Sequence, residues 1–246
     1  MRILLINPNT TPAITEAVTR AAAAAVREAQ FVPATGRFGA RYIASRAAAA
    51  VAAHAALDAY AEHGEGCDAV YLACFGDPGL LALKELASVP VVGMAEASCH
   101  LACTLGRRFA IVTGGERWGP MLEEFVAALG LSRRLAGIRT VAPTGAEIAR
   151  DPDGALGMLA QACRDCAADG AEAVILGGAG LAGLAEQIAG VPVPVLCSVA
   201  AGARAAAAAA ALGPRKAERG SLAAPPPVET VGLSPALAGR MGGGRG

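Results

Sequence analysis

The hydrophobic and polar positions of this chain form two copies of one pattern. Residues 68–93 and 172–197 each contain an apolar run, a glycine-containing turn, a short helical pattern and a second apolar run near Val-Pro-Val. The copies align without a gap at an offset of 104 residues, so that Gly76 matches Gly180 and Pro90 matches Pro194. Short apolar runs that lead through a turn into a helix are typical of buried parallel strands. A fold with two similar halves is therefore predicted.

The starts of the two halves repeat as well. Residues 3–6 and 109–112 are apolar runs at an offset of 106, and each is followed by a polar or glycine-rich turn. The whole pattern predicts strands near 2–6, 69–73, 90–93, 109–113, 136–141, 172–176 and 194–197. It predicts helices near 12–28, 43–62, 78–87, 95–105, 120–129, 145–150, 153–168, 181–189 and 199–212. This alternation favours an α/β fold of two pseudo-symmetric lobes, with mostly parallel sheets flanked by helices.

Helix start signals and composition shifts refine this organisation. Thr11-Pro12 and Asp77-Pro78 each place a capping residue before a proline at the first helical position, and Thr144 with Glu147 forms a capping box. We expect a first lobe at 1–94, with helix 198–212 packing back on it, and a second lobe at 95–197. Residues 213–246 are rich in Pro, Gly and Arg, which predicts a disordered tail.

Composition narrows the classes of function. The chain has 246 residues, a net charge of zero and no basic patch, so a nucleic-acid partner is not expected. No apolar run approaches the length of a membrane span, and the run after Arg2 is too short for a signal peptide. Seven cysteines without secretory features indicate reduced thiols and a cytoplasmic location. Cys163 and Cys166 lie in a helical pattern with no nearby histidine, so no metal site is predicted.

The repeat is broken at one position, where Cys74 stands opposite Gly178. Ligands of parallel α/β sheets bind beyond the carboxyl ends of the strands. Four loops, at 7–11, 74–78, 113–117 and 177–180, should therefore meet in an active site between the lobes. Cys74 would lie just before a helix N-terminus, which favours a thiolate usable as a base near neutral pH.

Each candidate residue also has a purely structural interpretation. A lone cysteine at a strand end is usually a small buried hydrophobe. Asp77 is better explained as a helix cap than as a base, and Asn9 fits a turn. Thr113 and Gly114 could simply end a strand. The three histidines fall in helical patterns with no evident catalytic partner.

Three motifs resemble the hydantoin racemase branch of the aspartate/glutamate racemase superfamily: I-N-P-N-T at 6–10, A-C-F-G-D-P-G-L at 73–80 and V-T-G-G-E-R-W at 112–118. The resemblance covers residues 1–212. It implies a cofactor-independent enzyme in which two cysteines flank the substrate's α-carbon, one removing a proton and the other delivering one. The first maps onto Cys74 and the second onto Gly178. The candidate substrate-binding residues are Asn9, Phe75, Gly76, Thr113, Gly114, Gly178 and Ala179.

The glycine at this position opens several alternatives, because glycine is neither an acid nor a base. The chain could be a racemase-like isomerase that uses one thiol at a carbon next to a carboxylate or amide carbonyl, with Cys197 or water replacing the lost acid. It could be a single-cysteine decarboxylase, similar to the arylmalonate decarboxylase branch, in which the thiol belongs to the other half. It could also be a catalytically weak homologue that binds a small carboxylate. The expected binding partner is a small carboxylate or a hydantoin. The sequence is also compatible with a homo-oligomer.

Overall fold

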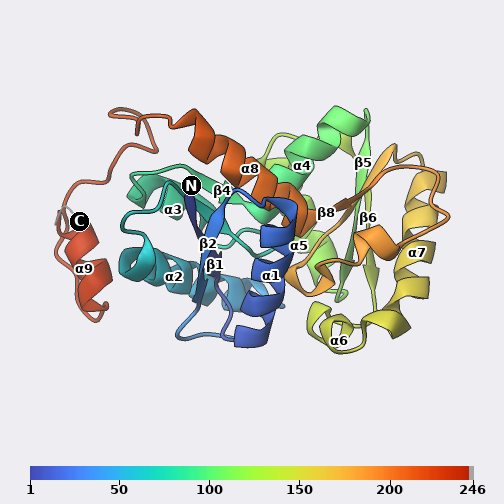
Figure 1. The fold of residues 1–246 in the computed structure, drawn as a ribbon, viewed down its shortest axis with the longest axis horizontal. Helices are drawn as coiled ribbons and strands as arrows, with labels where there is room; N and C mark the ends of the chain where they lie inside the picture. Colours follow the sequence, from blue (N-terminus) through green and yellow to red (C-terminus); the bar gives the residue numbers. More distant parts are fainter. Residues whose placement is uncertain (244–246) are drawn as a thin grey trace.

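The computed structural model describes residues 1–243 and consists of two parallel four-stranded sheets, each covered by helices (Figure 1). The sheets have the strand orders β2-β1-β3-β4 and β6-β5-β7-β8. The strands are β1 (Arg2–Asn7), β2 (Gln30–Thr35), β3 (Ala69–Leu72), β4 (Val91–Gly93), β5 (Phe109–Gly114), β6 (Leu135–Val141), β7 (Ala173–Leu176) and β8 (Val195–Cys197). The α-helices are α1 (Pro12–Ala25), α2 (Arg46–His63), α3 (Leu80–Leu86), α4 (Met94–Leu105), α5 (Trp118–Ala128), α6 (Gly145–Arg150), α7 (Pro152–Ala168), α8 (Ser198–Leu212) and α9 (Pro235–Met241).

The sheet register confirms the internal repeat. Ile3 of β1 pairs with Ala69 of β3, and Phe109 of β5 pairs with Ala173 of β7, as the two sequence offsets require. The strands β3 and β7 are buried along their whole length. A continuous apolar run of this kind is what a parallel strand covered on both faces needs. The predicted two-lobed α/β fold is therefore correct.

Helix α8 lies across the first lobe although it follows the second in the chain. It contacts α4, α1, β3 and β4. The Tyr71 hydroxyl donates a hydrogen bond to the Val199 carbonyl at 3.1 Å. Gly202 allows this approach, because a Cβ atom there would lie 2.4 Å from the Tyr71 ring. The small residues of α8 thus let a helix pack directly on the first sheet.

Two predicted segments differ from the structure. The pattern predicted no strand between the helices at 12–28 and 43–62, yet β2 forms the edge of the first sheet with Pro33 inside it. Proline is tolerated in an edge strand, because the backbone on the outer side of that strand has no neighbouring strand to hydrogen-bond. The helix predicted at 181–189 is wrong. Two 3-10 turns, η2 (Ala179–Leu181) and η3 (Ala185–Gln187), stand there, separated by Gly183 with a φ of 79°.

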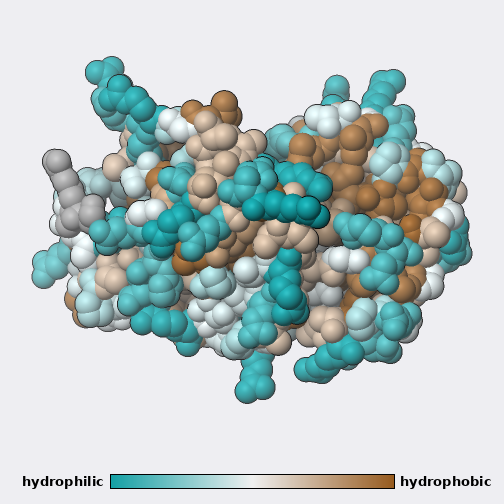
Figure 2. Space-filling view, viewed as in Figure 1, coloured by the Kyte–Doolittle hydropathy of each residue, from teal (hydrophilic) through white to brown (hydrophobic). Residues whose placement is uncertain are grey.

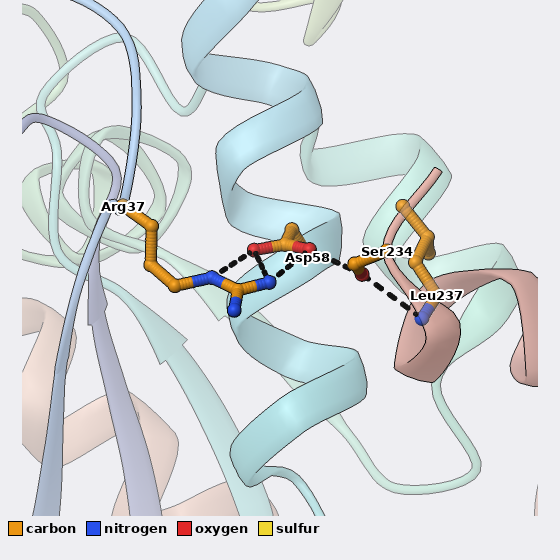
Figure 3. A network of polar contacts seen from close by, with 4 residues as sticks. All are labelled: Arg37, Asp58, Ser234 and Leu237. Carbon is orange, nitrogen blue, oxygen red and sulfur yellow. Dashed lines mark hydrogen bonds and ion pairs between the residues drawn. The ribbon is translucent and has the colours of Figure 1, made fainter. Parts of the chain in front are cut away.

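The expectation of a disordered tail also differs from the structure, apart from residues 244–246, which lie outside the described range. Helix α9 packs on α2, and Leu237 is 1% exposed. Ser234 caps α9 and donates a hydrogen bond of 2.6 Å to Asp58, which also holds Arg37 at 2.8 Å (Figure 3). The Ser-Pro pair at the start of α9 is the helix signal that the tail's composition concealed.

No helix among residues 1–243 is both long and apolar enough to cross a membrane. On the face shown in Figure 2, the largest hydrophobic area lies over the second lobe, and hydrophilic side chains gather near the middle of the molecule.

Candidate active site

A cavity of about 480 Å³ opens between the two lobes at the carboxyl ends of the central strands. Its walls come from the loop after β1, helix α1, the loop before α2, the turns after β3 and β7, and helix α6. The predicted residues that line it are Asn9, Cys74, Phe75, Thr113, Gly178 and Ala179. The sequence offsets and the strand ends therefore brought six of the eight predicted positions to one cavity.

Two predicted residues, Gly76 and Gly114, stand behind the cavity wall. Gly76 packs under Trp118, because a Cβ atom there would lie 2.6 Å from the indole ring. The Gly114 carbonyl accepts a hydrogen bond from Tyr42 at 3.3 Å. Both glycines therefore support cavity residues without lining the cavity themselves.

Cys74 lies directly beyond β3 and is 9% exposed, at the inner end of the cavity. Burial, reinforced by the carboxylate of Asp77, raises the pKa of this thiol to about 12. The expected stabilisation of a thiolate is not found, because α3 begins only at Leu80 and its N-terminus does not reach Cys74. The thiol of the free protein is consequently protonated near neutral pH.

Asp77 caps a different helix from the one its sequence position predicts. Its two carboxylate oxygens accept hydrogen bonds from the backbone N–H groups of Ala95 and Glu96 at 2.9 and 2.7 Å, at the start of α4. Asp77 has a φ of 46° and is the one non-glycine residue with positive φ among residues 1–243. Burial raises its pKa to about 7, although these N–H donors oppose the shift. The Cys74 turn is thus fastened to α4 through a strained residue.

Gly178 occupies the symmetric position with a different backbone. Its φ is 138°, a region that residues with a side chain rarely adopt, whereas Cys74 keeps a negative φ. A Cβ atom on Gly178 would lie 3.2 Å from Leu181 and 3.8 Å from the Thr113 hydroxyl. The second-lobe side of the cavity therefore presents backbone and a hydroxyl where the first lobe presents a thiol.

Asn9 is held so that its amide nitrogen is available to a ligand. Its side-chain oxygen accepts hydrogen bonds from Asn7 Nδ2 and from the Thr11 backbone N–H, both at 2.9 Å. Asn7 is fully buried, and its Nδ2 also donates a hydrogen bond of 3.0 Å to the Thr15 hydroxyl of α1. This bond fixes the Asn7 and Asn9 side chains relative to α1. With its oxygen occupied, Asn9 offers an N–H donor suited to a carbonyl or carboxylate.

The turns after β3 and β7 contribute further donors. Within residues 1–243, the backbone N–H groups of Phe75, Gly76, Ala179 and Gly180 donate no hydrogen bond to the protein. Unpaired N–H groups at strand-end turns form sites for negatively charged oxygen. Phe75, Ala179 and Gly180 also line the cavity, so both lobes supply unpaired donors beside it.

Aromatic side chains join the two lobes around the cavity. The Tyr42 hydroxyl donates to the Gly114 carbonyl and accepts from the Gly145 N–H at 3.2 Å, so a first-lobe loop is tied to the second lobe. Phe75 lies against Gly177, where a Cβ atom would be 2.5 Å from its ring. Burial raises the pKa of Tyr42, which keeps its hydroxyl neutral.

Two alternatives can be compared with this geometry. Cys197, the candidate for a replacement acid, is half-buried at the end of β8 and does not line the cavity. No group of three or more potential metal ligands occurs among the described residues. Within the cavity, the groups able to exchange a proton are therefore the Cys74 thiol and the hydroxyls of Thr11, Tyr42 and Thr113.

Known proteins share both sequence and fold with this chain. The sequence profile of the Asp/Glu/Hydantoin racemase family matches residues 3–206. The chain belongs to this family. It is 36% identical over 236 residues to the hydantoin racemase of Pseudomonas sp. (strain NS671), covering 94% of this chain and 95% of the relative.

Solved structures agree with this membership. The allantoin racemase of Pseudomonas fluorescens superposes with a TM-score of 0.89 at 34% identity, covering 94% of this chain and all of that structure. Arylmalonate decarboxylase shares only the fold, with a TM-score of 0.59 and 18% identity over 85% of this chain and 92% of that structure. The protein is thus a racemase-family enzyme with the two-lobed architecture of its relatives.

Some cavity residues of this family member escaped the sequence analysis. Tyr42 lines the cavity but belongs to none of the three motifs, and Asn7, which holds Asn9 from behind the cavity wall, lay inside the first motif without an assigned role. Arg20, Arg41 and Arg150 carried no signal, because each belongs to a different element and only the fold brings them to one cavity.

Proposed function

We propose that the protein is a cofactor-independent isomerase that moves a proton at the acidic carbon of a 5-substituted hydantoin or a related amide, with Cys74 as the acid/base group. The observation that carries the proposal is the position of Cys74, alone at the inner end of a cavity rich in N–H donors. A hydantoin fits the names of the relatives, since allantoin is itself a substituted hydantoin.

The donors suit the charge that such a reaction develops. Removal of the proton from the ring carbon moves an electron pair onto the neighbouring carbonyl oxygen. The Asn9 amide and the free backbone N–H groups of the strand-end turns would stabilise this oxygen. To act as the base, Cys74 must first release its own proton to a water molecule in the cavity, and its raised pKa makes the resulting thiolate strongly basic.

Inversion requires a proton from the face opposite Cys74. The Thr113 hydroxyl is the nearest polar group to the position that a side chain on Gly178 would occupy, at 3.8 Å from its Cβ. This hydroxyl, or a water molecule that it holds, would deliver the proton and would then be reprotonated from solvent, and both are weak acids. Exchange at the Cys74 face should consequently be faster than inversion.

One observation favours a second candidate, decarboxylation of a malonate-type acid. The resting thiol of Cys74 is protonated, which suits a proton donor rather than a base. The bond between the α-carbon and one carboxylate carbon would break with loss of CO₂, and its electron pair would form the enolate. The Cys74 S–H would then protonate the α-carbon of this enolate. Gly178 lines the cavity without a side chain on the opposite side, where the departing group would lie.

One enantiomer of a 5-substituted hydantoin, incubated in deuterated buffer, tests the proposal. Optical rotation and deuterium uptake at the acidic carbon are followed with wild type, with Cys74→Ala and without enzyme. Exchange that depends on Cys74 supports the isomerase, and loss of rotation shows that the opposite face is also served. No exchange above background, combined with CO₂ release from an arylmalonate, would replace the isomerase with the decarboxylase.

A further inference from the structure

All charged side chains that line the cavity are arginines. Arg20 belongs to α1, Arg41 to the loop before α2 and Arg150 to the end of α6, and no Asp or Glu lines the cavity. The three arginines are exposed, so they stand at the rim where the cavity meets solvent. A protein with zero net charge therefore has a locally positive entrance.

These arginines form no ion pair and no side-chain hydrogen bond in the described part of the chain, although the pKa of the Glu147 carboxyl, lowered chiefly by its hydrogen bonds to Thr144, is lowered further by nearby Arg150. The ion pairs of residues 1–243 involve other arginines. Glu16 lies one turn before Arg20 on α1 but forms no ion pair with it. The carboxylate of Glu147, one turn before Arg150, is held by the capping box of α6. The positive charges at the rim are thus available to a ligand.

Small side chains connect the rim to the reactive end of the cavity. Ala13, Ala17 and Arg20 are spaced along one face of α1, and about 10 Å of helix axis separates the first from the last. Ala146 and Ala149 of α6 line the cavity beside Arg150. Both helices contact η2, which carries Ala179. Alanine side chains therefore line the cavity next to two of the three arginines.

We propose that the three arginines select substrates whose substituent on the acidic carbon is an apolar stem ending in a carboxylate. Guanidinium groups bind carboxylates through paired hydrogen bonds, and the apolar walls suit the stem. This inference rests on the proposed function for the position of the reacting carbon. The chemistry at the ring and the recognition of the substituent are nevertheless separable by experiment.

A matched pair of substrates tests the selection. Hydantoins carrying a 2-carboxyethyl or a 2-carbamoylethyl group at the acidic carbon have nearly the same shape and differ in charge. We expect kcat/KM for deuterium exchange to be about tenfold higher for the carboxylate. The ratio should fall with added salt, because exposed charges are screened. It should fall further in Arg20→Gln, Arg41→Gln and Arg150→Gln, and approach one in the triple variant.

Arg27→Gln is the matched control, since Arg27 is exposed just beyond α1 and does not line the cavity. Its ratio should equal that of wild type. Equal kcat/KM for both substrates in wild type, or an unchanged ratio in the triple variant, would overturn the inference.

Failure of the proposed function gives a different result. If neither hydantoin exchanges, calorimetric binding of the same two compounds replaces the kinetic comparison. Tighter binding of the carboxylate, lost in the triple variant and kept in Arg27→Gln, supports the inference without the reaction. Equal binding, or no measurable binding of the carboxylate, overturns it. Thermal unfolding of the triple variant confirms that the exposed substitutions leave the fold intact.

Discussion

The turns after β3 and β7 have the same place in their lobes and opposite local chemistry. The first holds a thiol on ordinary backbone and places its strain three residues later, at Asp77. The second places the unusual backbone at Gly178 itself and carries no side chain there. The two copies therefore share their strands and strand register, whereas the residue in the turn after the central strand decides whether a copy carries a reactive side chain.

The largest test of this contrast is removal of the thiol. Cys74→Ser should lower the rate of deuterium exchange by about 10²–10⁴-fold, the usual contribution of a positioned acid/base group. Cys197→Ser is the matched control, because Cys197 also ends a strand-to-helix segment but lies outside the cavity. Equal losses in the two variants would show that the assignment to the first turn is wrong.

A side chain at Gly178, in the turn after β7, should destabilise the protein because of the backbone conformation there. Gly178→Ala must adopt a φ of 138° or move the turn, so the free energy of unfolding should fall by about 1–3 kcal/mol. Urea unfolding measures this change. Gly157→Ala, at an exposed position inside α7 with open space around it, should instead stabilise by about 0.5–1 kcal/mol. Unchanged stability of Gly178→Ala would mean that the two turns are interchangeable.

The reactivity of Cys74 should depend on pH through its neighbour. Because burial raises the thiol pKa to about 12, alkylation by iodoacetamide should be slow at pH 7 and still rise at pH 10. The charge of Asp77 contributes to the raised pKa, so Asp77→Asn should lower it and speed alkylation at pH 8 several-fold.

Mass spectrometry of the Cys74 peptide gives these rates, and buried Cys163 of the second lobe reports any unfolding of the variant. A plateau of the wild-type rate below pH 9 would contradict the protonated thiol and restore the thiolate predicted from the sequence.

The smallest effect concerns the contact between the lobes. Tyr42→Phe removes two hydrogen bonds across the cavity and should cost about 0.5–1.5 kcal/mol in unfolding free energy while raising KM. Tyr60→Phe removes one bond to the Ser88 N–H inside the first lobe. This control should cost similar stability with no change in KM. An equal KM in the two variants would remove Tyr42 from the site.

The sequence predicted the strands and turns of the internal repeat well, and it predicted poorly the elements that have no matching copy. The strand pairs that share an offset, such as β3 with β7, were found because each copy supports the assignment of the other. Strand β2 was missed because Pro33 breaks its apolar run, and the helix at 181–189 was predicted by analogy with its partner copy. Gly183 keeps the positive φ of its counterpart Gly79, which precedes α3, so the difference in helix formation arises after this glycine, where the second copy forms the 3-10 turn Ala185–Gln187.

The site shows the same limit. Cys74, Asn9 and Thr113 were expected at one cavity because the strand ends of a parallel sheet meet at one edge, and all three line it. Their protonation and orientation depend on contacts distant in sequence, such as Asp77 with the start of α4. Burial and long-range hydrogen bonds of this kind leave no local pattern, so the sequence could locate the thiol but not its pKa.

The path of the last segments has a consequence for the order in which the protein folds. The second sheet comes from the continuous stretch 109–197, whereas α8 and α9 return to cover the first lobe. Domains usually fold from the N-terminus onward as the ribosome releases them. Here the first lobe is synthesised first but receives its covering helices α8 and α9 last. During translation its apolar surface therefore stays exposed, while the sheet of the second lobe can already form. Nascent chains stalled near residue 200 should therefore depend on chaperones through their first lobe.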